Sequence, residues 1–226
     1  MEETSMKRQL YKEIAHFNNI LKYVSKKTLL ILDIDNVLVH PRTYFCSNEW
    51  FDKCIEQDTQ GNLTREQLVN KYMPVFIAGA KVISYMAIEE DTPEIISSLQ
   101  KTGIKIMGLT SRNPCLKQLT LKCLGDVGID LSLTCPRDLL PSNGIIYTEG
   151  KNKGIKFLKF WKERKEDPEL GNIVFVDDGE RNVAHMLFAA KTLNIDFYGL
   201  RYAGADKMVE YYESLCAKRP YGFTMI

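Results

Sequence analysis

The sequence predicts a three-layer α/β fold, with a parallel sheet between helices and a mainly helical insertion after the first strand. Unbroken apolar runs at 28–32 and 172–176 are typical of strands that are buried on both faces. Helical stretches lie between such runs, and this alternation predicts parallel pairing through right-handed crossovers. The alternation breaks down between residues 41 and 90, which places the insertion there.

The other elements follow in chain order. Runs at 104–109 and 196–200 predict two more buried strands, and 129–134 is a weaker candidate. A helix is expected to begin at Asp91, because Pro93 suits a first helical turn, and to end at Gly103. Further helices are expected at 114–125, 152–165, 180–194 and 204–217.

The N-terminal segment, residues 7–24, is predicted to form an amphipathic helix that lies on the core. Its apolar residues recur at helical spacing, with charged residues between them. These apolar residues are Leu10, Ile14, Phe17, Leu21 and Val24.

We expect residues 1–40 and 91–226 to form the core and residues 41–90 to form the insertion. The insertion is rich in aromatic residues: Tyr44, Phe45, Trp50, Phe51, Tyr72, Phe76 and Tyr85. Two interpretations are equally favoured. The aromatic residues form an ordinary core of a helical elaboration, or the insertion is a cap that selects substrates at the active end of the sheet.

Composition excludes several classes of protein. The 226 residues carry a formal net charge of +1, and acids and bases are interleaved, so an electrostatic field that attracts nucleic acid is not expected.

No apolar run is long enough to span a membrane, and the N-terminus lacks the apolar core of a secretory signal. We therefore expect a cytoplasmic protein, with non-classical secretion as the alternative. The six cysteines form no C-x-x-C pair, which fits a reducing compartment.

The first candidate site is Asp33-Ile34-Asp35, directly after the first apolar run. Two carboxylates at this spacing suit a division of labour, in which one attacks and the other carries a proton. A turn with two capping acids is the structural alternative. Because the acids follow an entirely apolar strand, we favour the functional interpretation.

Hydroxyl and ammonium groups lie at corresponding places farther along the chain. Thr110 and Ser111 follow the run at 104–109, where hydroxyls either bind a phosphate oxygen or cap a helix. Lys153 begins a predicted helix and would neutralise charge on a phosphoryl group, with Lys151 and Lys156 as competing candidates.

Asp177 and Asp178 end the run at 172–176, so two buried strands both end in acid. Because the carboxyl ends of parallel strands share one edge of the sheet, these acids are expected to meet Asp33 there. Such a set of hard oxygen ligands suits Mg²⁺, which would also screen Asp33 from an anionic phosphate.

The candidate residues resemble the four motifs of the haloacid dehalogenase (HAD) superfamily. In chain order they are Asp33-x-Asp35-x-Val37, Thr110, Lys153 and Asp177-Asp178. The match extends from residue 28 to about residue 202. The residues around the motifs, such as 109–112 and 175–178, are similar to those of the DUF2608-like branch.

The resemblance implies a Rossmann-like core and a Mg²⁺-dependent phosphatase. Asp33 would be the nucleophile that forms an aspartyl-phosphate, and Asp35 the general acid and then the general base. Thr110, Ser111 and Lys153 would hold the phosphoryl group. Mg²⁺ would be bound by Asp33, the backbone carbonyl of Asp35 and Asp177, with Asp178 close by.

Three functions are compatible with these residues. The first is hydrolysis of a phosphomonoester, either a small molecule or a phosphopeptide; the aromatic insertion would suit phosphotyrosine. The second is a phosphotransferase or phosphomutase acting on a small metabolite. The third is a non-catalytic binding module with a HAD fold. Sequence leaves the physiological substrate and the oligomeric state open.

Overall fold

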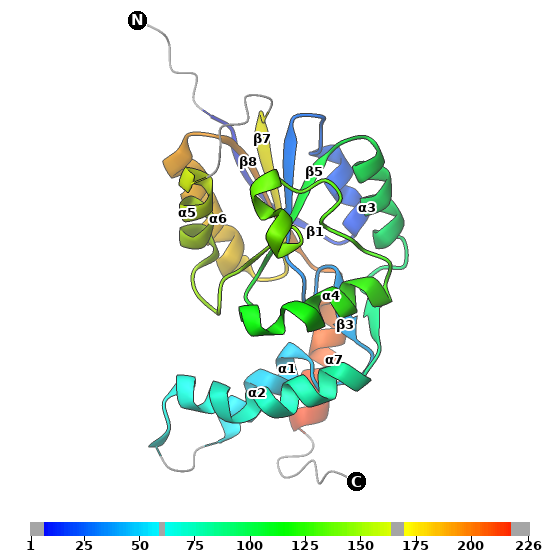
Figure 1. The fold of residues 1–226 in the computed structure, drawn as a ribbon, viewed down its shortest axis with the longest axis vertical. Helices are drawn as coiled ribbons and strands as arrows, with labels where there is room; N and C mark the ends of the chain where they lie inside the picture. The colour runs from blue at the N-terminus through cyan, green and yellow to red at the C-terminus, as the bar shows by residue number, and fades with distance from the viewer. Residues whose placement is uncertain (1–6, 59–61, 164–169, 218–226) are drawn as a thin grey trace, which may run out of the picture.

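The computed structural model describes residues 7–58, 62–163 and 170–217 (Figure 1). A six-stranded sheet has the order β1-β8-β7-β2-β5-β6, and every pairing in it is parallel. The predicted α/β class with a parallel sheet is thus confirmed. The strands are β1 (Gln9–Ile14), β2 (Thr28–Leu32), β5 (Lys105–Thr110), β6 (Ile145–Tyr147), β7 (Asn172–Asp177) and β8 (Asp196–Tyr202).

Strand β2 lies at the centre, and all five of its residues are buried. The chain passes from β2 outward to β5 and β6, and then returns to β7 on the other side of β2. Leu32 at the end of β2 pairs with Val176 of β7 and with Gly108 of β5. The chain order reverses between β2 and β7, and such a switch is where α/β sheets bind ligands.

Helices cover both faces of the sheet (Figure 1). Leu30 and Leu32 of β2 pack in one apolar cluster and Leu29 and Ile31 in another, because successive side chains of a strand point to opposite faces. One face is covered by the 3₁₀ helix η1 (Phe17–Lys22), α3 (Thr92–Lys101) and α4 (Lys117–Asp126). The other is covered by α5 (Lys153–Glu163) and α6 (Glu180–Leu193).

Residues 41–90 hold α1 (Asn48–Gln57) and α2 (Arg65–Val82). Strands β3 (Val39–Pro41) and β4 (Tyr85–Ala87) form an antiparallel pair at the base of this segment. The last helix, α7 (Asp206–Ala217), lies beside α1 and away from the sheet layers (Figure 1). Several aromatic residues of the segment pack on one another in an apolar cluster, which contains Phe45, Trp50, Phe51 and Phe76.

The predicted helix at 7–24 is wrong. Residues 9–14 form edge strand β1, which pairs in register with β8, and a separate 3₁₀ helix follows. Leu21, which the helical spacing placed on the core, is 49% exposed. The backbone groups of β8 would have no partner on that side without β1, so sheet pairing overrides the apolar periodicity.

The weak strand candidate at 129–134 is also wrong. This segment has no regular structure, although Ile129 and Leu131 are buried in the core. The strand that pairs with β5 is β6, which follows the 3₁₀ helix η4 (Arg137–Ser142). Another 3₁₀ helix, η3 (Pro114–Leu116), precedes α4. The two apolar residues therefore reflect a buried loop and not a strand.

Candidate active site

Asp33 directly follows the central strand, and only 6% of its surface is exposed. Its backbone N–H donates to the carbonyl of Val176 (2.9 Å), which holds it beside β7. One carboxylate oxygen accepts a hydrogen bond from the N–H of Ile34 (2.8 Å). The other lies 2.7 Å from Nζ of Lys153. Strand and ion pair together fix the direction of this side chain.

Lys153 begins α5, and its side chain is completely buried. Its Nζ also lies 2.6 Å from Oδ2 of Asp177, so one ammonium group bridges acids at the ends of two adjacent strands. Gly154 allows this approach, since a Cβ at that position would lie 2.2 Å from the carbonyl oxygen of His185 in α6. Burial opposes the charge, but the two acids outweigh it and raise the pKa of Lys153 to about 12.

The competing lysines do not reach this cluster. Lys151 forms an exposed ion pair with Glu149, and Nζ of Lys156 lies 3.8 Å from the same carboxylate. Of the three lysines that the sequence offered, the structure therefore brings Lys153 to Asp33.

Asp177 is fully buried, and both of its carboxylate oxygens are bonded. Oδ1 accepts hydrogen bonds from the N–H of Gly179 and the side-chain amide of Asn182, both at 2.9 Å. Oδ2 accepts from Lys153. Helix α6 begins directly after this turn, so the start of the helix holds the acid in place.

Asp33, Asp177 and Asp178 each offer a carboxylate oxygen within 4.8 Å of the others. Burial raises the pKa of Asp33 well above its usual value; Lys153 opposes this rise, and the charges of Asp177 and Asp178 add to it. Burial and the charge of Asp177 raise the pKa of Asp178 to about 6. Three acids facing one ammonium leave surplus negative charge, which a hard cation with oxygen ligands would neutralise.

Thr110 and Ser111 lie at the same edge of the sheet, at the end of β5. The Oγ1 of Thr110 is buried and accepts a hydrogen bond from the N–H of Arg112 (3.2 Å). Ser111 is exposed, and its carbonyl accepts from the N–H of Gly150 (2.8 Å). The two hydroxyl groups thus differ in environment, with Thr110 facing inward.

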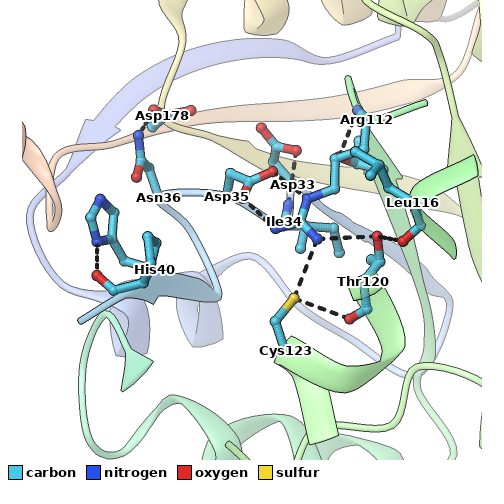
Figure 2. A network of polar contacts seen from close by, with 12 residues as sticks. Asp33, Ile34, Asp35, Asn36, His40, Arg112, Leu116, Thr120, Cys123 and Asp178 are labelled. Carbon is cyan, nitrogen blue, oxygen red and sulfur yellow. Dashed lines mark hydrogen bonds and ion pairs between the residues drawn. The ribbon is translucent and has the colours of Figure 1, made fainter. Parts of the chain in front are cut away.

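Asp35 is bound to Arg112 in an arrangement that the sequence did not reveal (Figure 2). Arg112 donates from Nε to one carboxylate oxygen (2.8 Å) and from Nη2 to the other (2.7 Å). The sequence expectation was that Asp33 and Asp35 address one point. In the structure each acid has its own cation: Asp33 pairs with a lysine from α5 and Asp35 with an arginine that follows β5.

Asn36 was also missed. It has a left-handed backbone conformation (φ 59°), which asparagine tolerates better than most residues. Its side-chain amide donates to Asp178 (3.2 Å) and to Glu49 of α1 (2.9 Å). His40 is buried, and its Nε2 lies 3.4 Å from Oε2 of Glu49. The sequence indicated Asn36 only as a polar residue that lies between the Asp33/Asp35 pair and the segment that forms β3.

A cavity of about 610 Å³ opens beside these residues. Asn36 and Asp178 line it from the core, Tyr44 and Glu49 from the segment 41–90, and Glu213 from α7. A ligand in the cavity would therefore contact Asp178 of the acid cluster, the insertion and the last helix together.

Comparison with known proteins identifies the family of this chain. The model of DUF2608, a family described as proteins of unknown function, matches residues 13–223. A Chlamydia pneumoniae protein whose name assigns it provisionally to the outer membrane is 22% identical over 220 residues, covering 88% of this chain and 80% of that protein. No helix within the described ranges combines the length and apolar content needed to cross a bilayer.

Among solved structures, a hydrolase from Pseudomonas syringae has a TM-score of 0.51 at 16% identity, with 82% of this chain and 90% of that chain covered. The HAD domain of effector protein Lem4 from Legionella pneumophila has a TM-score of 0.42 at 16% identity (85% and 96% covered). The class C acid phosphatase from Bacillus anthracis has a TM-score of 0.41 at 14% identity (90% and 84% covered). The chain belongs to the DUF2608 family, and its fold is similar to that of the Pseudomonas syringae hydrolase.

Proposed function

We propose that this protein is a Mg²⁺-dependent phosphomonoester hydrolase in which Asp33 is the nucleophile. One observation carries the proposal: a single buried ammonium, that of Lys153, bridges Asp33 and Asp177 within a cluster of three acids at the switch point of the sheet. A buried acid cluster at a strand edge suits phosphoryl transfer, in which the protein mainly positions groups and stabilises charge.

The chemistry proceeds in two steps. An oxygen of Asp33 attacks phosphorus while the bond to the ester oxygen breaks, and that oxygen takes a proton from Asp35. Water then attacks the resulting aspartyl-phosphate, gives a proton to Asp35, and releases phosphate with Asp33 restored. Lys153 stabilises the charge on the phosphoryl oxygens, and the hydroxyl of Thr110 donates to one of them.

The metal would be held by the carboxylates of Asp33, Asp177 and Asp178 and by the backbone carbonyl of Asp35. The surplus negative charge of the cluster supports this assignment, because hard oxygen ligands are what Mg²⁺ prefers. When bound, Mg²⁺ supplies positive charge that reduces repulsion between Asp33 and an anionic phosphate.

The substrate's leaving group would occupy the cavity beside Asn36 and Asp178. In this proposal residues 41–90 are a cap, and α7 completes the cavity wall with Glu213. Tyr44 is an aromatic residue in the cavity lining, which supports an aryl ester such as phosphotyrosine, on a peptide or as a small molecule. Phe45, Trp50, Phe51 and Phe76 instead pack within the segment's own cluster, so the preference for aryl groups rests on Tyr44.

The first experiment compares wild type with Asp33→Asn on p-nitrophenyl phosphate in the presence of Mg²⁺. We expect turnover to fall by at least about 1,000-fold, since the amide cannot form the aspartyl-phosphate. Asp138→Asn, at an exposed position on η4, is the matched control and keeps wild-type turnover. Wild-type turnover in Asp33→Asn would refute the mechanism.

The second experiment is a substrate panel of phosphotyrosine peptides, phosphoserine peptides and sugar phosphates. We expect phosphotyrosine to have the highest kcat/KM and Tyr44→Ala to reduce that advantage by about 10-fold. An advantage that Tyr44→Ala leaves intact would refute this role of Tyr44. Product analysis with alcohol acceptors distinguishes hydrolysis, which yields inorganic phosphate, from transfer to the acceptor.

A further inference from the structure

Arg112 is a buried cation that the steps above do not use. It is 9% exposed and follows Thr110 by two residues. Its guanidinium group donates to both carboxylate oxygens of Asp35, and Nη1 donates to Oγ1 of Thr120 (3.1 Å) and lies 3.4 Å from Sγ of Cys123 (Figure 2). A buried arginine is tolerated when such partners satisfy it, so this position is built for a fixed guanidinium.

Helix α4 provides the anchor. The hydroxyl of Thr120 donates to the carbonyl of Leu116 (2.9 Å), which leaves its oxygen free to accept from Arg112. Leu116 itself packs in the apolar cluster of the segment 41–90. The guanidinium group is therefore held by a helix that contacts both the sheet and the insertion.

We propose that Arg112 is the positioning residue of the general acid Asp35, an inference that rests on the proposed function. In the structure a two-point ion pair fixes the carboxylate. During turnover one oxygen leaves the guanidinium, takes up a proton from solvent and turns to the ester oxygen of the substrate, while the other oxygen stays on the guanidinium. The proton moves from Asp35 to the ester oxygen as the P–O bond breaks, and the paired arginine keeps the acid aimed at that oxygen.

The proposal requires the planar guanidinium group of an arginine at position 112. Arginine binds both oxygens of a carboxylate in one fixed orientation, whereas lysine supplies a point charge on a flexible stem. Arg112→Lys should therefore keep the charge and lose the orientation of Asp35. That loss differs from general damage, because among the steps that determine kcat/KM it affects only the one in which the leaving group is protonated.

Protonation matters most for esters with a basic leaving group. An alkyl phosphate releases an alkoxide unless it is protonated, whereas dinitrophenolate leaves without help. The experiment measures kcat/KM for β-glycerophosphate and for 2,4-dinitrophenyl phosphate in wild type, Arg112→Lys, Asp35→Asn and the double variant. Arg65→Lys is the control, since Arg65 makes an exposed pair with Asp52.

We expect Arg112→Lys to lower kcat/KM for β-glycerophosphate by about 10- to 100-fold, and for the dinitrophenyl ester by less than about threefold. Asp35→Asn should show the same order of substrates. Because both residues act through one step, the double variant should be no worse than Asp35→Asn. Arg65→Lys should match wild type on both esters.

Equal losses on the two esters, or losses that multiply in the double variant, would overturn the inference. If Arg112→Lys does not fold, as judged by its melting curve, Thr120→Val replaces it. That variant removes the anchor but keeps the ion pair, so a smaller loss with the same preference supports the role and a uniform loss overturns it.

An active wild type with an inactive Asp33→Asn but no substrate preference in Arg112→Lys refutes this inference alone. Absence of turnover in wild type refutes the proposed function and the inference with it.

Discussion

The amide of Asn36 donates to two half-buried carboxylates whose pKa values shift in opposite directions. Burial and the charge of Asp177 raise the pKa of Asp178, on the core side, to about 6. Burial also opposes ionisation of Glu49, on α1, but hydrogen bonds from His40 and Asn36 outweigh it and lower its pKa to about 2. The same donor thus joins an acid that resists ionisation to one that favours it.

The difference lies in how completely each acid is paired. Glu49 accepts from Asn36 and faces Nε2 of His40, whose Nδ1 lies 2.7 Å from the carbonyl oxygen of Pro41. Asp178 accepts one long hydrogen bond and has Asp177 beside it. The less completely paired acid is therefore on the core side, where a cation would bind, whereas Glu49 on the insertion side already has hydrogen-bond partners.

Removing the one cation of the acid cluster should have the largest effect. Lys153→Met leaves Asp33, Asp177 and Asp178 buried without an ammonium group. We expect a loss of about 3–5 kcal/mol in unfolding free energy at pH 7, because breaking a buried ion pair leaves uncompensated charge. Turnover should fall on the order of 100- to 1,000-fold. Urea denaturation and steady-state kinetics measure the two effects.

Lys151→Met is the matched control, two residues away in an exposed pair with Glu149. It should change the unfolding free energy by less than about 0.5 kcal/mol. If Lys153→Met were as stable as Lys151→Met, the acids would not depend on the ammonium, and the contrast between core side and insertion side would fail.

The next effect is the response of stability to pH and Mg²⁺. The folded-state pKa of Asp178 is raised, so the native state holds this proton more tightly than the unfolded state does. Its contribution is complete below the usual value of 3.8 and is lost as pH rises through about 6. Without metal, the cluster should therefore destabilise the protein at pH 8 relative to pH 5. Added Mg²⁺ should raise Tm by several degrees at pH 8 and by less at pH 5.

Asp178→Asn tests the origin of this response. The variant should show a flatter dependence of Tm on pH and a smaller gain from Mg²⁺, whereas Asp138→Asn should behave as wild type. A Mg²⁺ response that is the same at pH 5 and pH 8 would argue against competition between metal and proton at these carboxylates.

Sequence was sufficient for the central strands because their apolar runs are local. Runs at 28–32 and 172–176 became β2 and β7, and acids at their ends met around one lysine. The edge strand β1 was not predictable in the same way. Only its partner β8, almost the whole chain away, makes residues 9–14 a strand, and their local spacing fits a helix equally well.

The site was predictable where residue type and strand position coincide. Arg112 pairs with Asp35 across 77 residues, and Asn36 reaches Asp178 across 142. An arginine or an asparagine beside a strand end has many uses, so nothing local distinguished these two from solvated side chains. Lys153 was separable from Lys151 and Lys156 only after Gly154 had placed α5 against α6.

The smallest effect concerns the insertion side and has the opposite pH dependence. Glu49 has a depressed pKa, so its stabilising contribution is present above its ordinary value of 4.5 and is lost as pH falls toward about 2. Glu49→Gln should lower the unfolding free energy by about 1–2 kcal/mol at pH 7, and this loss should shrink as pH falls through that range.

Glu56→Gln, in an exposed pair on the same helix, is the control. Urea denaturation of metal-free protein across pH measures both variants. If the loss of unfolding free energy in Glu49→Gln does not depend on pH, Glu49 packs as a neutral side chain. The two carboxylates bound to Asn36 would then not differ in charge.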